Sequence, residues 1–186
     1  MSTDGGIPGG EQAFLNFVFR CGSVITSDRK AARSYKSEAT DLLKLFDDLD
    51  FTLASNRVRI PRMMGIEESS RHWSVLMVFH HLNQVNGRII EIIRELHRDL
   101  EPQDQVSLAD FKPDPNCDVS VISDFEVINL QFDKLIDELA PLKRRTSYPH
   151  PWFGYLTAHH WACLAAVHMR IHRRQAKKIV AMQGLA

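Results

Sequence analysis

Cysteine is scarce in this 186-residue chain, and the three that occur, Cys21, Cys117 and Cys163, are widely spaced and odd in number. A disulfide framework is therefore not expected, and the pattern favours a reducing, cytoplasmic location. An excess of charge of one sign is also lacking, since 23 basic residues balance 23 acidic ones. This balance offers no global electrostatic basis for binding nucleic acid or an anionic membrane surface.

Long hydrophobic runs are missing as well. A membrane-spanning helix needs about 20 apolar residues, and the run AFLNFVF at 13–19 is far shorter. The residues ahead of it are acidic rather than basic, which is unlike a secretory signal. Strand-like alternation of apolar and polar residues is absent. We therefore expect a soluble, all-α protein with neither a membrane nor a nucleic acid as partner. The basic run 170–178 is expected to be a solvated helix face.

Apolar residues make up 44% of the chain, which suffices for one sizeable core. They recur with helical spacing in four long segments, at about 28–51, 73–100, 123–140 and 157–181. A shorter apolar segment, 11–26, predicts an extra N-terminal helix that packs on the main body or on a second subunit. Residues 1–10 contain four glycines and a proline and are expected to form a disordered tail. Residues 11–186 then form a single domain, a four-helix bundle.

Local signals refine this expectation. Ser74 and Thr157 are suited to cap the second and fourth long helices, and Ser123 with Glu126 has capping-box spacing at the start of the third. The polar connection between the second and third helices has some 18 residues, which can reach roughly 60 Å when extended. A 26-residue helix is only about 39 Å long. The third helix can therefore begin parallel to the second.

Two histidines, His168 and His172, stand one helical turn apart on the inward-facing stripe of the last helix. Buried imidazoles are costly without partners. One interpretation is a bound metal, and the other is a pair of neutral core histidines that are hydrogen-bonded to carbonyls or carboxylates. A mononuclear site needs a third protein ligand. His81, on the inner face of the second helix, is the best candidate for it.

Other polar residues are candidates for supporting roles. Gln175, one turn beyond His172, and His80 could orient the ligands through hydrogen bonds. Cys163 projects from a different face of its helix and is not counted as a ligand. Surface roles are expected for three further histidines, His150, His159 and His160. Four arginines could hold an anionic cosubstrate, although solvated side chains are the simpler interpretation: Arg57, Arg59, Arg62 and Arg71.

Two segments resemble the metal motifs of the DinB/YfiT-like superfamily. RHWSVLMVFHHLNQ, at 71–84, is similar to the first motif, and HPWFGYLTAHHWACLAAVHMRIHRRQ, at 150–175, is similar to the second. Matched position by position, the family's three metal-binding histidines fall on His81, His168 and His172. The resemblance covers about residues 28–182 and implies a four-helix bundle of up-down-down-up order. The chain departs from the family in carrying the apolar segment 11–26 ahead of the usual first helix.

The resemblance also implies a function. Members include thiol-dependent S-transferases and isomerases that use bacillithiol, mycothiol or glutathione, often with zinc or nickel; iron and manganese are alternatives. Three histidines leave coordination positions open, which is typical of a catalytic metal. Metal-assisted hydrolysis without a thiol is an alternative. A non-catalytic dimeric stress or interaction protein, with a structural metal or none, is another. We expect a small-molecule substrate and a homodimer.

Overall fold

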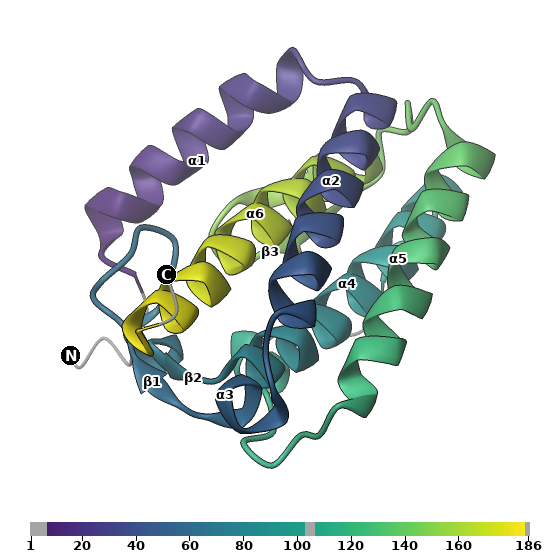
Figure 1. Ribbon diagram of the computed structural model, residues 1–186. Coiled ribbons are helices and arrows are strands. Elements are labelled where there is room, and N and C mark those ends of the chain that lie inside the picture. Colours follow the sequence, from purple (N-terminus) through teal and green to yellow (C-terminus); the bar gives the residue numbers. More distant parts are fainter. Residues whose placement is uncertain (1–6, 103–106, 185–186) are drawn as a thin grey trace.

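The computed structural model describes residues 7–102 and 107–184 and is built on a bundle of four long helices (Figure 1). These helices are α2 Asp28–Asp47, α4 Val75–His97, α5 Ser120–Leu139 and α6 Ala158–Met182. Helices α2 and α6 run in one direction, and α4 and α5 run in the other. The all-α, up-down-down-up bundle predicted from the sequence is therefore confirmed.

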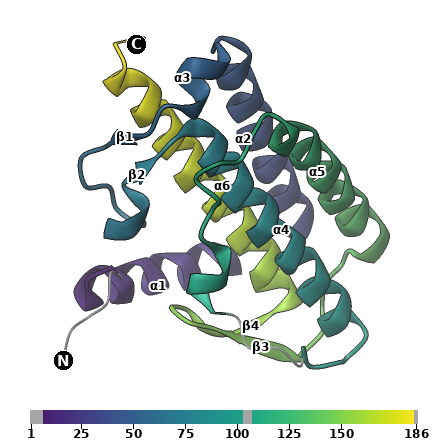
Figure 2. The same ribbon diagram turned by 90° about the horizontal axis from the view of Figure 1, so that it is seen from below.

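The long connection between α4 and α5 makes this order possible. It leaves the end of α4, contains the short 3₁₀ helix η2 at Leu108–Phe111, and crosses the bundle before α5 begins (Figure 2). As a result α4 and α5 are parallel neighbours, as the length of the connection predicted. The crossing also brings the backbone of Phe111 against α4, where it contacts a side chain of the candidate site.

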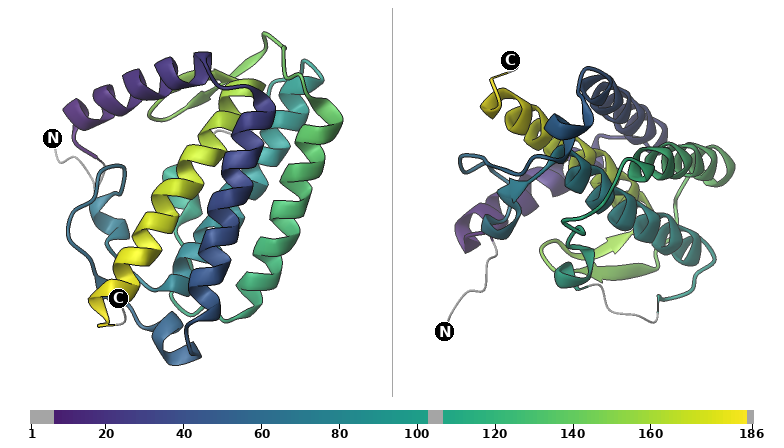
Figure 3. Two further views of the ribbon diagram at one scale, coloured as in Figure 1. Left: turned by 45° about the horizontal axis from the view of Figure 1, so that its top comes forward. Right: turned by 60° about the horizontal axis from the view of Figure 1, so that its bottom comes forward.

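A further helix, α1 Gly9–Val24, lies across the bundle beside a β-hairpin (Figure 3). The hairpin pairs β3 Ser147–His150 with β4 Gly154–Thr157. Arg20 of α1 donates to the carbonyl oxygens of Phe153 at 2.5 Å and Tyr155 at 2.9 Å. The rings of Phe19 and Phe153 lie 5.0 Å apart. The extra N-terminal helix is therefore present and packs on the main body.

Only one face of α1 is buried. Phe19 is buried, whereas Phe14 and Phe17 are 54% and 68% exposed. The helix begins at Gly9, inside the segment 1–10 that was expected to be a disordered tail, and Ile7 just before it is buried. Residues 1–6 of that segment lie outside the described residues. The folded part of the chain therefore begins closer to the N-terminus than the glycine content suggested.

The first long helix of the bundle is shorter than expected. It ends at Asp47, and a separate short helix, α3 Phe51–Ser55, follows. Acidic residues at a helix C-terminus oppose the helix dipole. One of them starts the next helix instead, because the Asp50 carboxylate accepts a hydrogen bond from the Leu53 N–H at 2.9 Å.

The predicted caps have mixed outcomes. Ser74 caps α4, since its hydroxyl accepts from the Met77 N–H at 3.2 Å. The capping box expected at Ser123 is not formed, because α5 already begins at Ser120. There the Asp118 carboxylate accepts the Ser120 N–H at 2.8 Å, and Ser123 donates back to the Ser120 carbonyl. The sequence signal for the start of α5 was therefore Asp118, two residues before the helix begins.

Short strands are present although the sequence predicted none. Besides the β3–β4 hairpin, β1 Val58–Arg59 pairs with β2 His72–Trp73. The 3₁₀ helix η1, Glu68–Ser70, lies between β1 and β2. Ladders of two to four residues are too short to produce a recognisable alternation. The segment 141–156, expected to be an irregular connection, thus contains most of a hairpin that shapes the candidate site.

Helices α2 and α6 are joined by charge as well as by apolar contact. The Glu38 carboxylate of α2 accepts hydrogen bonds from Arg170, at 2.7 Å, and from Arg173. Arg170 and Arg173, which belong to the basic run 170–178, therefore link α6 to α2 through ion pairs. Tyr35 stacks on Phe132 in the core, with ring centroids 4.2 Å apart. Among the described residues, no helix combines the length and apolarity that crossing a membrane requires.

Candidate metal centre

Three imidazoles converge inside the bundle, one from α4 and two from α6. They belong to His81, His168 and His172, and one ring nitrogen from each lies within 4.8 Å of the others. The Nε2 atoms of His81 and His168 are 3.2 Å apart. The structure therefore brings together the three histidines that the sequence singled out. The i, i+4 spacing on α6 puts the rings of His168 and His172 only 4.4 Å apart, centroid to centroid.

Gln175 determines how His172 faces this cluster. The Gln175 NH₂ donates to the Ser70 carbonyl at 2.7 Å, so its Oε1 is turned toward the ring. Oε1 then accepts the Nδ1–H of His172 at 2.7 Å. The indole of Trp73 stacks on the same ring, 5.9 Å away and 11° from parallel. His172 is thereby held with an unprotonated Nε2.

His81 is fixed in the same tautomer by a different partner. Its Nδ1–H donates to the Phe111 carbonyl at 2.7 Å, because a carbonyl can only accept. Nε2 of His81 therefore also presents a lone pair to the cluster. Residue Phe111 belongs to η2, and sequence reasoning missed it because a backbone carbonyl in a crossing connection leaves no residue-type signal.

The geometry and chemistry of these nitrogens fit a divalent metal. Two imidazole ligands at about 2.05 Å from a tetrahedral ion have nitrogens about 3.3 Å apart, close to the 3.2 Å between His81 and His168. The unprotonated Nε2 atoms of His81 and His172 both need a donor. His168 can supply at most one proton to them, and its own Nδ1 is buried without a hydrogen-bond partner in the described structure. One cation would satisfy all three rings.

Burial keeps these rings in the neutral form that binds metals. Desolvation lowers the pKa of His81 to about 4, against the hydrogen bond to Phe111 that raises it. Burial, followed by the neighbouring imidazoles, lowers the pKa of His168 and of His172 well below the ordinary value. No carboxylate joins the three-histidine group among the described residues. The donor set is therefore neutral.

His80 does not have the orienting role that the sequence suggested. Its Nδ1 accepts the backbone N–H of Asp114 at 3.1 Å, so the ring supports the crossing connection. Within the described part of the chain, it has no hydrogen bond to the three imidazoles. The physical reason is the 100° step between consecutive helical residues, which turns His80 away from the bundle interior. Of the two predicted orienting residues, the structure places only Gln175 beside a candidate ligand.

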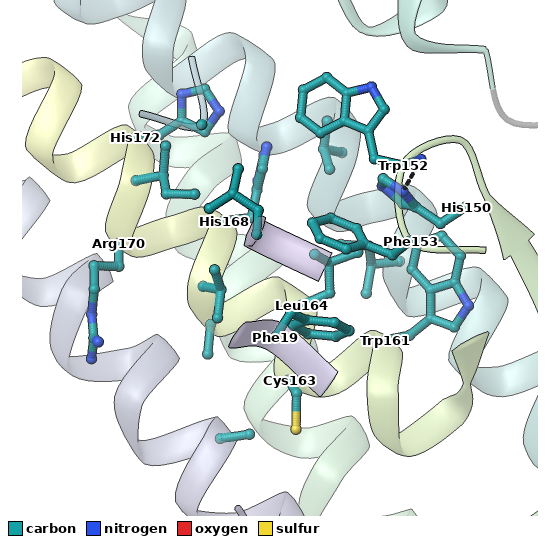
Figure 4. A pocket seen from close by; sticks show the side chains of 18 of the residues that line it. Phe19, His150, Trp152, Phe153, Trp161, Cys163, Leu164, His168, Arg170 and His172 are labelled. Carbon is teal, nitrogen blue, oxygen red and sulfur yellow. Dashed lines mark hydrogen bonds between the residues drawn. The ribbon is translucent and has the colours of Figure 1, made fainter. Parts of the chain in front are cut away.

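A cavity of about 460 Å³ adjoins the cluster. It lies between α1, α4, α6 and the β3–β4 hairpin, and most of the side chains that line it are apolar (Figure 4). His81, His168 and His172 contribute to its wall. Aromatic residues from the hairpin and the neighbouring helices form another part: Phe19, Trp152, Phe153 and Trp161. A pocket of this size suits a small, largely apolar molecule.

His150 and His159, for which surface roles were expected, are instead packed against other parts of the protein. His150 lines the cavity, where burial lowers its pKa to about 4, and its Nδ1 accepts the Trp152 N–H at 3.0 Å. His159 pairs with Asp28, 131 residues away in the sequence. Position in a connection or at a helix start suggested exposure, but the hairpin and α1 cover this end of α6.

Comparisons with known proteins establish the fold. No protein-family model matches the chain, and no curated protein sequence matches it. Among solved structures, YfiT from Bacillus subtilis, described as a probable metal-dependent hydrolase with an unusual four-helix bundle topology, aligns with a TM-score of 0.61 at 16% identity, over 86% of this chain and 89% of its own.

Two further structures are similar. TT2238, a four-helix bundle protein, aligns with a TM-score of 0.54 at 22% identity, over 85% of this chain and 99% of its own. An uncharacterised protein from Escherichia coli UTI89 aligns with a TM-score of 0.62 at 12% identity, over 87% and 96%. The chain thus has the YfiT-like four-helix-bundle fold that its resemblance to the DinB/YfiT-like superfamily implied.

Proposed function

We propose that this chain is a metal-dependent enzyme in which His81, His168 and His172 hold one divalent ion beside an apolar substrate cavity. The observation that carries the proposal is the fixed tautomer of two ligands. Gln175 and the Phe111 carbonyl leave the Nε2 atoms of His172 and His81 unprotonated, and both rings lie beside His168 in the cavity wall. Imidazole ligands suit zinc and nickel, which we favour, with iron or manganese as alternatives.

An ion with three neutral ligands and open positions would supply Lewis acidity, which lowers the pKa of a water or thiol nucleophile toward neutrality. The chain's own residues would do the rest. The aromatic walls of the cavity bind the apolar part of the substrate and exclude bulk water. Glu67 is the one carboxylate among the described residues that line the cavity, and we propose it as the proton acceptor.

Hydrolysis is the reaction that we place first. YfiT, whose fold this chain shares, is described as a probable metal-dependent hydrolase. Most of the cavity wall is apolar, which suits a substrate with an apolar body. Transfer or isomerisation with bacillithiol, mycothiol or glutathione is the second candidate, because the sequence motifs resemble those of enzymes with that chemistry.

Metal binding is tested first, with the purified full chain. Wild-type protein loaded with zinc or nickel should retain one ion per chain by elemental analysis. His81→Ala, His168→Ala and His172→Ala should each lose most of that metal. His80→Ala is the matched control, because it removes the adjacent imidazole of α4 that faces Asp114 instead. Equal metal retention by all four variants would refute the site.

Turnover is tested second, on uncharged aryl and alkyl esters with and without each of the three thiols. Metal-dependent hydrolysis without thiol supports the first reaction, and activity only with a thiol supports the second. One bound ion with no turnover of any kind would favour the alternative of a non-catalytic protein with a structural metal. The cavity beside the cluster supports an enzyme, since a purely structural site needs no such space.

The homodimer predicted from the sequence remains a proposal, and we assign it to the outer face of α1. Exposed apolar side chains recur there at spacings of three and seven: Phe14, Phe17 and Val24. Such a stripe is typical of a helix that packs against another helix. Light scattering should give a dimer for wild type and a monomer for Phe17→Asp, whereas Val127→Asp, on the exposed face of α5, should stay dimeric. A monomeric wild type would contradict the proposal.

A further inference from the structure

A second group of reactive side chains lines or adjoins the cavity and shares no residue with the three-histidine cluster. The Sγ atom of Cys163 lies 3.6 Å from Nε2 of His159. Nδ1 of His159 lies 2.5 Å from a carboxylate oxygen of Asp28. A thiol, an imidazole and a carboxylate in this order form the arrangement that activates a cysteine nucleophile in enzymes.

The hydrogen bonds of His159 show that it is an imidazolium. Its Nδ1 faces the Asp28 carboxylate, and its Nε2 lies 3.0 Å from the Ser23 carbonyl oxygen. Both partners can only accept, so both ring nitrogens carry a proton. The hydrogen bond to Asp28 is the largest cause that raises the pKa of His159, to about 11. Cys163 therefore has a positive charge beside its sulfur at neutral pH.

Asp28 is held firmly enough to orient this ring. It is the first residue of α2, and its second carboxylate oxygen accepts the backbone N–H of Leu142 at 2.9 Å. Burial raises the pKa of Asp28, but the bonds from His159 and Leu142 outweigh it, so the pKa is lowered. The carboxylate thus stays ionised and connects the start of α2 to the first turn of α6.

Cys163 belongs to the cavity wall. The side chain is buried, but it lines the same cavity as the metal cluster, together with Ser23 and Thr26. Figure 4 shows the sulfur pointing away from the ring of Phe19. Because most of the cavity wall is apolar, it suits small molecules with an apolar body. The His159 imidazolium, whose Nε2 lies 3.6 Å from this sulfur, can deliver a proton to a molecule that is attacked there.

We propose that Cys163, paired with His159, is a nucleophilic thiol that forms a covalent adduct with small, uncharged electrophiles of the α,β-unsaturated carbonyl class that enter the cavity. The thiol releases its proton to solvent, the sulfur forms a bond to the β-carbon, and the alkene π pair moves to the α-carbon. That carbon takes a proton from Nε2 of His159, which regains one from solvent. The product is a thioether, and no oxidant or reductant is consumed. This site does not depend on the proposed metal chemistry.

The other two cysteines are internal controls. Cys21 is exposed on α1, and Cys117 is half-buried, where burial raises its pKa. Folded, chelator-treated full-length protein is treated with N-ethylmaleimide at pH 6.5, and adducts are mapped by mass spectrometry over time. Cys163 should react at least 10-fold faster than Cys21 despite its burial. Unmodified Cys163 after Cys21 has reacted would overturn the proposal.

Two variants test the partners of the sulfur. His159→Gln keeps a side-chain donor but removes the charge, and Asp28→Asn keeps an acceptor but removes the carboxylate. Each should slow adduct formation at Cys163 by at least 10-fold while leaving Cys21 unchanged. Folding of both variants is checked by circular dichroism. The comparison of Cys163 with Cys21 in the wild-type protein does not depend on either variant. An unchanged rate at Cys163 in a folded variant would show that the ion pair is structural only.

The route to the sulfur is tested with a sulfonated maleimide. A charged reagent should label Cys21 normally but Cys163 at least 10-fold more slowly than N-ethylmaleimide does, because most of the cavity wall that it would have to pass is apolar. Equal labelling of Cys163 by both reagents would refute access through the cavity. The metal content is measured in the same samples before chelation. A sample without metal would contradict the metal site, and a sample without labelled Cys163 would contradict the thiol site, so the two proposals can fail independently.

Discussion

Gln175 stands between the His172 ring and the Ser70 carbonyl and fixes the tautomer of the histidine. Its NH₂ donates to Ser70 and its Oε1 accepts from His172 Nδ1, each at 2.7 Å. Because the side chain is fully buried, water cannot replace either bond. One amide of α6 therefore couples the end of η1 to the orientation of a candidate metal ligand.

Replacing this amide should weaken metal binding without removing a ligand. In Gln175→Leu, His172 loses the acceptor for its Nδ1–H, and the ring is free to adopt the other tautomer. Loss of such a partner lowers metal affinity by about 10–100-fold. Competition for zinc against a chromophoric chelator measures the change. The His80→Ala variant serves as the control, and an affinity equal to wild type in Gln175→Leu would contradict the assigned role.

The sequence predicted the bundle and the three histidines because both depend on helical periodicity. The spacing of His168 and His172 on an apolar stripe determines that both face inward, and His81 follows from the stripe of its own helix. The long polar connection predicted parallel α4 and α5. These features are local or depend only on chain length, so residue patterns were sufficient.

The partners of those histidines could not be predicted in the same way. The Phe111 carbonyl that holds His81 is a backbone atom in the crossing connection. The Asp28–His159 pair joins residues 131 positions apart, and no pattern in either segment refers to the other. The β3–β4 hairpin was missed because its strands have only four residues each. Long-range contacts of this kind appear only once the helices have packed.

The cavity should bind a neutral apolar probe, and filling it should abolish binding. Leu164 is buried on α6 and lines the cavity, so Leu164→Trp places an indole in that space. We expect N-phenyl-1-naphthylamine fluorescence to rise with wild-type protein and to fall at least fivefold in this variant. Leu130→Trp, on the exposed face of α5, is the matched control and should bind as wild type does. Equal binding by both variants would show that the probe lies elsewhere.

The Glu38 carboxylate should contribute more to stability than an exposed ion pair does. Burial raises the pKa of Glu38, but the hydrogen bonds from Arg173 and Arg170 outweigh this effect and lower it. The carboxylate is therefore ionised between α2 and α6. Glu38→Gln should cost about 2 kcal/mol in the free energy of unfolding, measured in urea. Glu138→Gln, which breaks the exposed pair with Lys134, should have a much smaller effect. Equal losses would contradict the claim.

The His159–Asp28 pair should make stability fall as the pH rises. Folding raises the pKa of His159 from 6.5 to about 11, first through its bond to Asp28. Between these values the folded protein holds a proton that the unfolded chain releases, so each added pH unit lowers the free energy of unfolding by at most about 1.4 kcal/mol. The contribution is complete below pH 6.5. Asp28, whose pKa is lowered, withdraws its own contribution only as the pH falls below about 4.

Urea unfolding of wild type and His159→Gln at pH 6, 7.5 and 9 isolates this effect, because the other groups cancel in the difference. The stability advantage of wild type should be largest at pH 6 and should shrink steadily toward pH 9. His72→Gln removes an exposed histidine and should track wild type at every pH. An advantage that stays constant over this range would mean that His159 holds no extra proton in the folded state, and it would also remove the cation that the Cys163 site requires.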